Sequence, residues 1–483
     1  MDRRLVGIDL GIASAHTVRV LDGDGSVVGR HRCEPTVAEF ARVEAAALAG
    51  AAPGTTLEVV IEPTGPAWLP VAVFFTGRGH IVYRVSSAKA ADLRRFLSRH
   101  AKSNGIDADT LARLPLVAPA GLAPVELPGP EAAALDRRVR AADRLTRAAA
   151  EHKVRIKDLV RQLMPATPLT GELGVADLAV LERYADPHAL LAMGTAKLTR
   201  LIVKASHGQQ GAERAAAWRA AASAAVELYT AYPAMPFCDL ADEIASEVRL
   251  LRATQTELAR HRAHREDAYR WSDPGQLARS LPGLGEVGAP VLVAVMGRPD
   301  RFPTGGHFRS FTGLVPRASE TGETDRKGQP MSKAGSALLR TTLVRAADTA
   351  RRQDPQLAKI YYTQMVERGA EHLKACCVVA AALAERGWAV RRRGMPYVVC
   401  DTDATPVTPE EAKKIIAERW TVPVEVRARR RSTKHKIHKV KVGKAPQQVL
   451  AGHEQPDARS ADTGGDLPQP RSCDHTKIKR KTA

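Results

Sequence analysis

Apolar and polar residues alternate along the start of the chain with the two-residue period of half-buried strands. Three runs with this period predict strands at residues 4–11, 16–22 and 26–34. The "DGDG" turn from Asp22 to Gly25 separates the second run from the third. Such a turn between two alternating runs predicts a β-hairpin.

Helix and strand patterns alternate from residue 36 to about residue 115. Residues 36–50 have helical spacing and begin with the capping pair Thr36 and Glu39. The remaining predicted elements are a strand at 56–65, a helix from about Pro66, a strand at 80–86 and a helix from Ser87. This order predicts a mixed sheet covered by helices.

Two long helices are predicted in the middle of the chain, at residues 131–164 and at about 238–270. In the first helix, apolar residues recur every three to five positions, as in a coiled-coil seam without a strict heptad. The seam residues are Leu135, Val139, Ala142, Leu145, Ala149, Val154 and Leu159. The pattern indicates self-association, and a solvated helical hairpin is the alternative. The Ala-rich stretch between these helices carries no recognisable chemistry.

A second compact unit is predicted from Asp273 to about Val399. Within it, "SLPGLGEVGAPVLVAVMG" at 280–297 has the pattern of a helix, a glycine-rich turn and a second helix, which resembles the helix-hairpin-helix. In that motif the turn amides, here at Gly283 and Gly285, bind a DNA phosphate together with a helix N-terminus, without reading sequence. An ordinary tight turn between two helices is the alternative.

The chain after Asp401 loses its apolar periodicity. A short helix is predicted at 408–420, and the remainder is rich in basic, Pro, Gly and Gln residues, as in disordered tails. Residues 424–483 contain 15 Lys and Arg against 6 Asp and Glu, a net charge of +9. Such a tail adds salt-dependent nucleic-acid affinity, and a merely solubilising role is the alternative.

Composition narrows the class of protein. A chain of 483 residues predicts two to four units. Its net charge of +19 favours a polyanionic partner, most simply nucleic acid, and about half of this excess lies outside the basic tail. Aromatic residues make up only 4% of the chain, which argues against a single-strand binder that stacks bases.

The six cysteines form no CxxC pair, which predicts reduced, structural thiols in a cytosolic protein and no zinc module. The N-terminus has no apolar signal segment, and no run of about 18 apolar residues is present. We therefore expect a cytoplasmic, nucleoid-associated protein without a membrane partner.

Four oxygen-bearing side chains are predicted to converge in the first unit. Asp9 and Glu62 end the first and fourth predicted strands, in "VGIDLG" and "VVIEPTG". Asn104 and Asp107 in "KSNGIDADTLARL" are three residues apart, and hence on one face of a predicted helix. Three carboxylates and an amide oxygen suit Mg²⁺ or Mn²⁺, and two such ions could bind a phosphodiester.

Each of these acids has a simpler interpretation when it is taken alone. "GIDLG" also opens the actin- and Hsp70-type ATPase fold, but the second phosphate loop and the adenosine turn of that fold are not found in this sequence. Asp107 could merely start its helix, where an acid is favoured by the helix dipole. The combination is therefore more specific than any one member.

Ser332 in "PMSKAGSALLRTTLV" lies between a charged loop and a predicted helix. A serine at this position caps the helix or acts as a nucleophile, and the two roles are compatible. As a nucleophile it requires an activating base or metal, and no histidine is close in sequence. Four cations near it are candidates to hold a phosphate or are simply solvated, namely Arg317, Lys327, Lys333 and Arg340.

Six motifs in this order resemble those of the DEDD-type insertion-sequence transposases, a family described as bridge-RNA-guided serine recombinases. They are "GIDLG", "EPTG", "KSNGIDADTLA", "LPGLG", "FRSFTGLVPR" and "MSKAGSALLR". The resemblance covers about residues 4–115 and 275–398. The helical middle of the chain matches in type only, and the tail is outside the resemblance.

The resemblance implies an α/β fold followed by all-α parts. The implied domains are a RuvC-like (RNase H-like) acidic domain at 1–115, a helical coiled-coil region at 116–272 and a mostly helical transposase domain at 273–400. Composition adds a basic, largely disordered tail at 401–483. It also implies Ser332 as the nucleophile. The implied partners are donor and target double-stranded DNA, a structured guide RNA and further copies of the chain, as a homodimer or tetramer.

Asn104 departs from the family pattern. Asp9, Glu62 and Asp107 fall on the first, second and fourth acids, whereas the third acid is usually an Asp where this chain has Asn104. An amide oxygen can ligate Mg²⁺ but brings no charge, so weaker metal affinity is expected. Asp109 is a possible replacement, although its position faces away from Asp107 on a helix.

Three functions follow from these observations. The first is a transposase that moves an insertion element through a phosphoserine intermediate. The second is a Holliday-junction-type endonuclease that uses only the acidic cluster and water. The third is an inactive nucleic-acid-binding relic, for which Asn104 is the support.

Overall fold

The computed structural model describes residues 3–63, 65–98, 101, 103–169, 171–317, 320–321, 324–325 and 329–429. The chain divides into two units, with the boundary between Gly129 and Pro130. None of the helices in the described ranges combines the length and the apolar character that crossing a bilayer requires. The five cysteines in these ranges are all free thiols.

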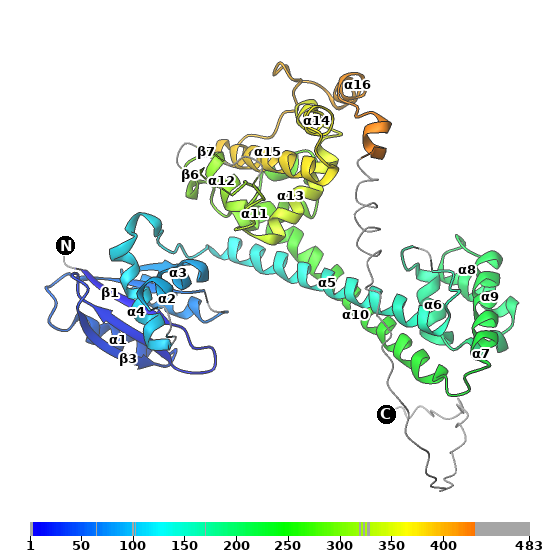
Figure 1. The fold of residues 1–483 in the computed structure, drawn as a ribbon, viewed down its shortest axis with the longest axis horizontal. Helices are drawn as coiled ribbons and strands as arrows, with labels where there is room; N and C mark the ends of the chain where they lie inside the picture. Colours follow the sequence, from blue (N-terminus) through cyan, green and yellow to red (C-terminus); the bar gives the residue numbers. More distant parts are fainter. Residues whose placement is uncertain are drawn as a thin grey trace, which may run out of the picture. The chain divides into compact units, whose positions relative to one another are not determined.

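The first unit carries a sheet at the N-terminal end of the chain (Figure 1). This mixed sheet has five strands in the order β3-β2-β1-β4-β5. Its strands are β1 (Arg3–Asp9), β2 (His16–Leu21), β3 (Val27–Cys33), β4 (Thr56–Ile61) and β5 (Ile81–Arg84). The first three strands pair antiparallel, whereas β4 pairs parallel with both β1 and β5. A mixed sheet was expected here, and this topology is consistent with a RuvC-like domain.

Helices cover both faces of this sheet. On one face, α1 (Val37–Leu48) and α2 (Trp68–Gly77) bury apolar side chains against alternate residues of the central strands. On the other face lie α3 (Ser87–Leu97) and α4 (Asn104–Val117), followed by a single 3-10 turn at Pro119–Gly121. Successive strand residues point to opposite faces, so strand position alone decides which helix layer a side chain meets.

The predicted hairpin turn and the predicted helix cap of the first unit are both confirmed. Gly25 has a φ of +91° in the turn between β2 and β3, a conformation that glycine adopts without steric cost. Thr36 caps α1, because its side chain accepts a hydrogen bond from the amide of Glu39. Both predictions needed only the residues within a turn of the chain.

The second unit begins with α5 (Pro130–Leu163), which packs along α10 (Phe237–Ser272) as a helical hairpin. His152 Nδ1 lies 2.6 Å from Glu247 Oε2 across this pair. Most of the predicted seam turns inward, although Val154 is 58% exposed. A single chain therefore forms the hairpin alternative, and self-association stays a prediction.

The Ala-rich stretch folds as a compact helical end on this hairpin. Its helices are α6 (Val175–Tyr184), α7 (Pro187–Ala192), α8 (Thr195–Ala205) and α9 (Ala212–Tyr229). They share one apolar core with the C-terminal half of α5 and the N-terminal half of α10. Within it, the buried carboxylate of Asp177 accepts hydrogen bonds from Trp218 and Arg214 at 2.9–3.0 Å.

A second apolar core joins the N-terminal end of α5 and the C-terminal end of α10 to the C-terminal helices. These are α11 (Gly288–Met296), α12 (Gly305–Thr312), α13 (Ala337–Ala350), α14 (Pro355–Tyr362) and α15 (His372–Arg393). The last helix, α16 (Pro409–Arg419), packs against α14. Short elements between them are 3-10 turns at Leu277–Ser280 and Pro299–Arg301, a π-helix at Thr363–Glu367 and the paired strands β6 (Glu320–Thr321) and β7 (Thr324–Asp325).

Residues 401–429 differ from the expected disordered tail. The predicted helix at 408–420 is present as α16, begun by a capping box between Thr408 and Glu411. Arg419 pairs with Asp401 at 3.0 Å, and Val422 is buried in the core of the C-terminal helices. The expectation that order fades at Asp401 is therefore wrong for this segment. Residues 430–483 lie outside the described residues.

Candidate functional site

Asp9 and Glu62 lie at neighbouring positions on one face of the sheet. The parallel register pairs Ile8 of β1 with Ile61 of β4; Asp9 is the last residue of β1, and Glu62 is the first residue after β4. Ile8 and Ile61 point into the α1–α2 layer. Alternation therefore directs Asp9 and Glu62 to the opposite face, which α3 and α4 cover.

Gly7 sets how closely α4 approaches β1 on that face. A Cβ at Gly7 would lie 2.0 Å from the carbonyl oxygen of Ala108, so the two backbones pack with no room for a side chain. One turn later, Ala112 packs against Leu5. The helix thus runs antiparallel to β1, and its first turn lies toward the strand end that carries Asp9. This arrangement directs Asn104 and Asp107 to the same end of the sheet.

Arginines occupy this region together with the acids. Arg94 of α3 pairs with Asp107 at 3.0 Å, and both side chains are partly buried. The three carboxylates of Asp9, Glu62 and Asp107, all within the described residues, do not all lie within 4.8 Å of one another. The Arg94 pair neutralises Asp107, and a divalent ion at this site would have to compete with it. The sequence analysis did not identify Arg94.

The two candidates for the third acid are placed differently. Asn104 is the first residue of α4 and is exposed, while Ser103 caps the helix by accepting from the amide of Ile106. Asp109 pairs with Arg113 one turn later at 2.8 Å. Asp109 is therefore committed to its own helix, as its position predicted, and is a poor replacement for Asn104.

His16 holds the loop that follows Asp9. Its Nδ1 accepts a hydrogen bond from the amide of Gly11 at 3.1 Å, and the ring is almost fully buried. Burial lowers the pKa of His16, with an opposing effect from Glu34, so the neutral ring remains an acceptor. Its Nε2 is buried and has no partner in the described part of the chain. Sequence alone did not single out this histidine.

Ser332 is not the cap of the helix that follows it. Ser336 caps α13, because its Oγ accepts from the amide of Leu339 at 3.3 Å. Ser332 instead lies on an extended segment, where its amide donates to Val315 O at 2.8 Å. Its Oγ is buried and has no hydrogen-bond partner among the residues that the structure describes.

The segment between Ser332 and Ser336 is held tightly against the end of α12. A Cβ at Gly335 would lie 1.9 Å from the carbonyl oxygen of Phe311. Arg340 Nη1 donates to Thr312 O and to Gly335 O at 3.3 and 3.2 Å. Arg340 therefore anchors this segment through backbone carbonyls, a different role from the predicted phosphate contact.

The other predicted cations near Ser332 are less constrained. Arg317 and Lys333 are exposed, and Lys333 has a φ of +54°, which is uncommon outside glycine. Lys327 lies outside the described residues. Arg317 and Lys333 thus remain candidates to contact a phosphate.

The two glycines of the predicted helix-hairpin-helix differ. The amide of Gly283 donates to Gln353 Oε1 at 3.1 Å, and a Cβ there would lie 2.3 Å from Ala346 O. Gly283 is therefore a packing glycine, and its amide is engaged within the protein. Gly285 is exposed with open space around it, so its amide is the accessible one. The helix before the turn is a single 3-10 turn, shorter than the motif implies.

A cluster of three possible metal ligands was missed by sequence analysis. Asp348 of α13 and His372 and Cys376 of α15 offer ligand atoms that all lie within 4.8 Å of one another. The spacing of His372 and Cys376 by four residues was a usable signal, because such residues share a helix face. Asp348 could not be added without knowing that α13 packs on α15.

Comparisons with known proteins agree with this organisation. Residues 6–165 match the DEDD transposase family of IS110 elements, and residues 275–363 match the transposase family IS116/IS110/IS902. The two matched regions contain the acidic positions and Ser332, respectively. Fold and matches together define a transposase, an enzyme that cuts and rejoins DNA. The chain belongs to the IS110 family of insertion-sequence transposases, with a DEDD-type N-terminal domain.

Individual relatives support this assignment over different lengths. The chain is 26% identical to an uncharacterized protein of insertion element IS110 from Streptomyces coelicolor, over 71% of this chain and 84% of the relative. It is 25% identical to an uncharacterized protein of insertion element IS116 from Streptomyces clavuligerus, over 53% of this chain and 61% of the relative. A probable family 20 transposase from Pseudomonas aeruginosa is 35% identical, over 23% of this chain and 32% of the relative.

Proposed function

We propose that this transposase cuts and rejoins DNA with Ser332 as the nucleophile. Ser332 Oγ attacks the phosphorus of a DNA phosphodiester, its proton passes to a base in the assembled site, and a 3′-hydroxyl leaves. The product is a phosphoserine bond to the DNA 5′-phosphate. Attack by the 3′-hydroxyl of another strand on this phosphorus releases Ser332 and joins the strands.

The placement of Ser332 Oγ is the single observation that carries this proposal. A buried hydroxyl normally has a hydrogen-bond partner, yet this one has none within the described residues. Its neighbour Ser336 performs the capping that would otherwise explain a serine here. An unsatisfied hydroxyl on a segment anchored by Gly335 and Arg340 favours a role that requires a reacting group.

The acids of the first unit supply the second half of the proposed site. Asp9 ends β1 and Glu62 directly follows the neighbouring parallel strand β4, and α4 begins at the same end of the sheet with Asn104 and Asp107. This set of oxygen ligands fits Mg²⁺ or Mn²⁺. A bound ion would lower the pKa of a nucleophile and neutralise charge on the phosphate. Arg94 now pairs with Asp107, and an ion held by these residues would replace that contact.

The proposed partners are donor and target DNA and a structured RNA that selects them by base pairing. The protein would then contact backbone and shape, which fits a chain with a net charge of +19 and only 4% aromatic residues. We further propose that residues 1–115 and 273–400 act as separate acidic and serine domains, with the active site shared between copies of the chain in a homodimer or tetramer.

The decisive test replaces Ser332 and uses Ser336 as its matched control. Ser332→Ala should abolish both strand exchange and the covalent protein–DNA adduct, with DNA binding unchanged. Ser336→Ala removes the cap of α13 and should lower the free energy of unfolding by about 1 kcal/mol, while the adduct still forms. Cleavage that persists in Ser332→Ala would instead support the endonuclease that uses the acidic cluster and water. Restoration of activity by Asn104→Asp in an inactive wild type would indicate a relic.

A further inference from the structure

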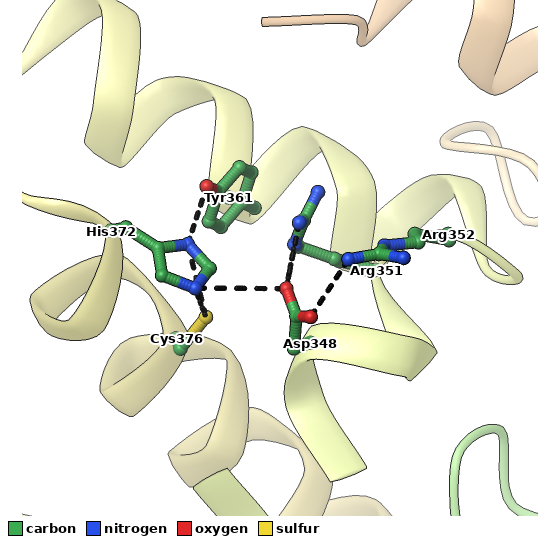
Figure 2. Close-up of polar contacts among 6 residues, drawn as sticks. All are labelled: Asp348, Arg351, Arg352, Tyr361, His372 and Cys376. Atoms are coloured by element: carbon green, nitrogen blue, oxygen red, sulfur yellow. Dashed lines mark hydrogen bonds and ion pairs between the residues drawn. The ribbon is translucent and has the colours of Figure 1, made fainter. Parts of the chain in front are cut away.

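The cluster on α13 and α15 has the composition of a transition-metal site. His372 Nε2 lies 3.8 Å from Asp348 Oδ1, and Cys376 Sγ lies 3.7 and 3.8 Å from the two ring nitrogens of His372. Figure 2 shows the three side chains directed at one another from the two helices. Ligand atoms around a tetrahedral zinc ion are about 3.3–3.8 Å apart, as follows from metal–ligand bonds of about 2.0–2.3 Å.

We propose that Asp348, His372 and Cys376 bind Zn²⁺ or a similar thiophilic divalent metal. Thiolate and imidazole ligands favour zinc over magnesium, which prefers oxygen. His372 and Cys376 are four residues apart on α15 and so form a preorganised chelating pair on one helix face. Asp348 adds the third ligand from α13. The site is therefore chemically distinct from the oxygen-rich acidic site of the first unit.

Tyr361 is placed to orient the imidazole of His372 by a hydrogen bond to the ring nitrogen that would not bind the metal. Its hydroxyl lies 2.8 Å from His372 Nδ1 (Figure 2). A metal on Nε2 leaves Nδ1 protonated, and the Nδ1–H would donate to the tyrosine oxygen. A histidine that binds a metal commonly donates its other ring N–H to such a partner, which fixes the ring orientation.

The three side chains differ in their exposure to solvent. Cys376 is buried, whereas the side chains of His372 and Asp348 are 54% and 36% exposed. The site therefore opens to solvent on one side, where a water could complete a tetrahedron. Burial raises the pKa of the Cys376 thiol to about 11, with the Asp348 charge acting in the same direction. Metal coordination replaces that thiol proton.

Two arginines compete with the metal for Asp348. Arg351 donates to Asp348 Oδ1 at 2.6 and 2.9 Å, and Arg352 donates to Oδ2 at 2.8 Å. Asp348 is consequently the weakest of the three ligands, and His372 and Cys376 should account for most of the affinity. A bound ion would link α13, which begins five residues after Ser332, to α15.

Cobalt titration of the full chain tests this site directly. Co²⁺ is used as the probe because a cobalt–thiolate bond gives a near-ultraviolet charge-transfer band. Reduced, metal-free wild type should develop this band with saturation at one equivalent, and one equivalent of Zn²⁺ should remove it. Cys376→Ser should lose the band. Cys377→Ser, which alters the adjacent thiol of the same helix, should retain it.

Further variants assign the remaining ligands. His372→Ala and Asp348→Asn should each weaken Co²⁺ binding at least tenfold, and Tyr361→Phe should weaken it about tenfold. A wild type without the band would overturn the proposal. A band retained in Cys376→Ser would place the thiolate elsewhere in the chain and would overturn it as well. Unchanged affinity in Asp348→Asn would contradict the three-ligand site. Circular dichroism of each variant verifies that it is folded.

Discussion

Replacing Gly335 by alanine tests whether the position of the Ser332 segment controls catalysis. An ideal Cβ at Gly335 lies 1.9 Å from Phe311 O, whereas real Cβ atoms essentially never approach within 3.0 Å. The segment must therefore move by about 1.1 Å, the difference between these two distances. It moves more easily than α12, because Phe308 anchors that helix in the core.

The expected loss can be estimated from this displacement. A misplacement of about 1 Å at a reacting group can cost about 100-fold in rate, which corresponds to about 2.7 kcal/mol of activation free energy. The free energy of unfolding should fall by about 1–3 kcal/mol, the usual cost of inserting a methyl group into a filled space. The defect in chemistry should therefore be measurable in protein that is still folded.

The assay is formation of the serine–DNA adduct in a single turnover, with DNA binding measured in parallel. Gly306→Ala is the matched control, because its Cβ would meet only Thr304 Oγ1 at an ordinary 3.5 Å. Gly306 lies in the first turn of α12, where alanine is the better helix former. The control should therefore keep both its stability and its activity. Wild-type adduct formation by folded Gly335→Ala protein would refute the reasoning that this segment is rigidly positioned.

Three further predictions concern the acids, the assembly and the tail. Alanine at Asp9, Glu62 or Asp107 should lower strand cleavage by orders of magnitude with nucleic-acid binding intact; full turnover of wild type in excess EDTA would contradict a metal site. Mixing Asp9→Ala with Ser332→Ala protein should restore partial strand transfer if the site is shared, and co-assembled mutants that stay inactive would disprove sharing. Deleting residues 430–483 removes 13 Lys and Arg against 5 Asp and Glu, a net charge of +8. Nucleic-acid binding should weaken with a shallower salt dependence, and a large drop in melting temperature would show that this tail is docked.

The start of the basic tail is a feature that local sequence did not predict. Composition favoured a boundary near residue 424, but Val422 is buried and Val426 packs against the same core. Val422, Val424 and Val426 alternate with other residues as in a strand, whereas residues 424–429 are helical, so local periodicity does not predict the structure of this segment. Its order depends on packing against the core of the C-terminal helices, which no local pattern contains.

The role of Ser332 was left open by the sequence for a similar reason. Ser332 and Ser336 both precede an apolar-periodic run, and either could cap it. The start of α13 at Ala337 decides between them, because the capping residue is the one directly before the first helical residue, which is Ser336. The sequence predicted Arg340 as a phosphate contact or a solvated cation. In the structure it donates to the backbone carbonyls of Thr312 and Gly335.

Sequence by itself determined the strands, the long helices and the order of the six motifs, because these depend on periodicity and short spacing. The sequence predicted that Asp9 and Glu62 converge only if the first and fourth strands are neighbours, and the pairing of β1 with β4 supplies that adjacency. Tertiary structure alone decided that Arg94 holds Asp107, that the amide of Gly283 is engaged, and that Asp348 meets His372 and Cys376. Such contacts join residues of separate elements, and their distances follow from how helices and strands pack, which the linear pattern of one chain does not encode.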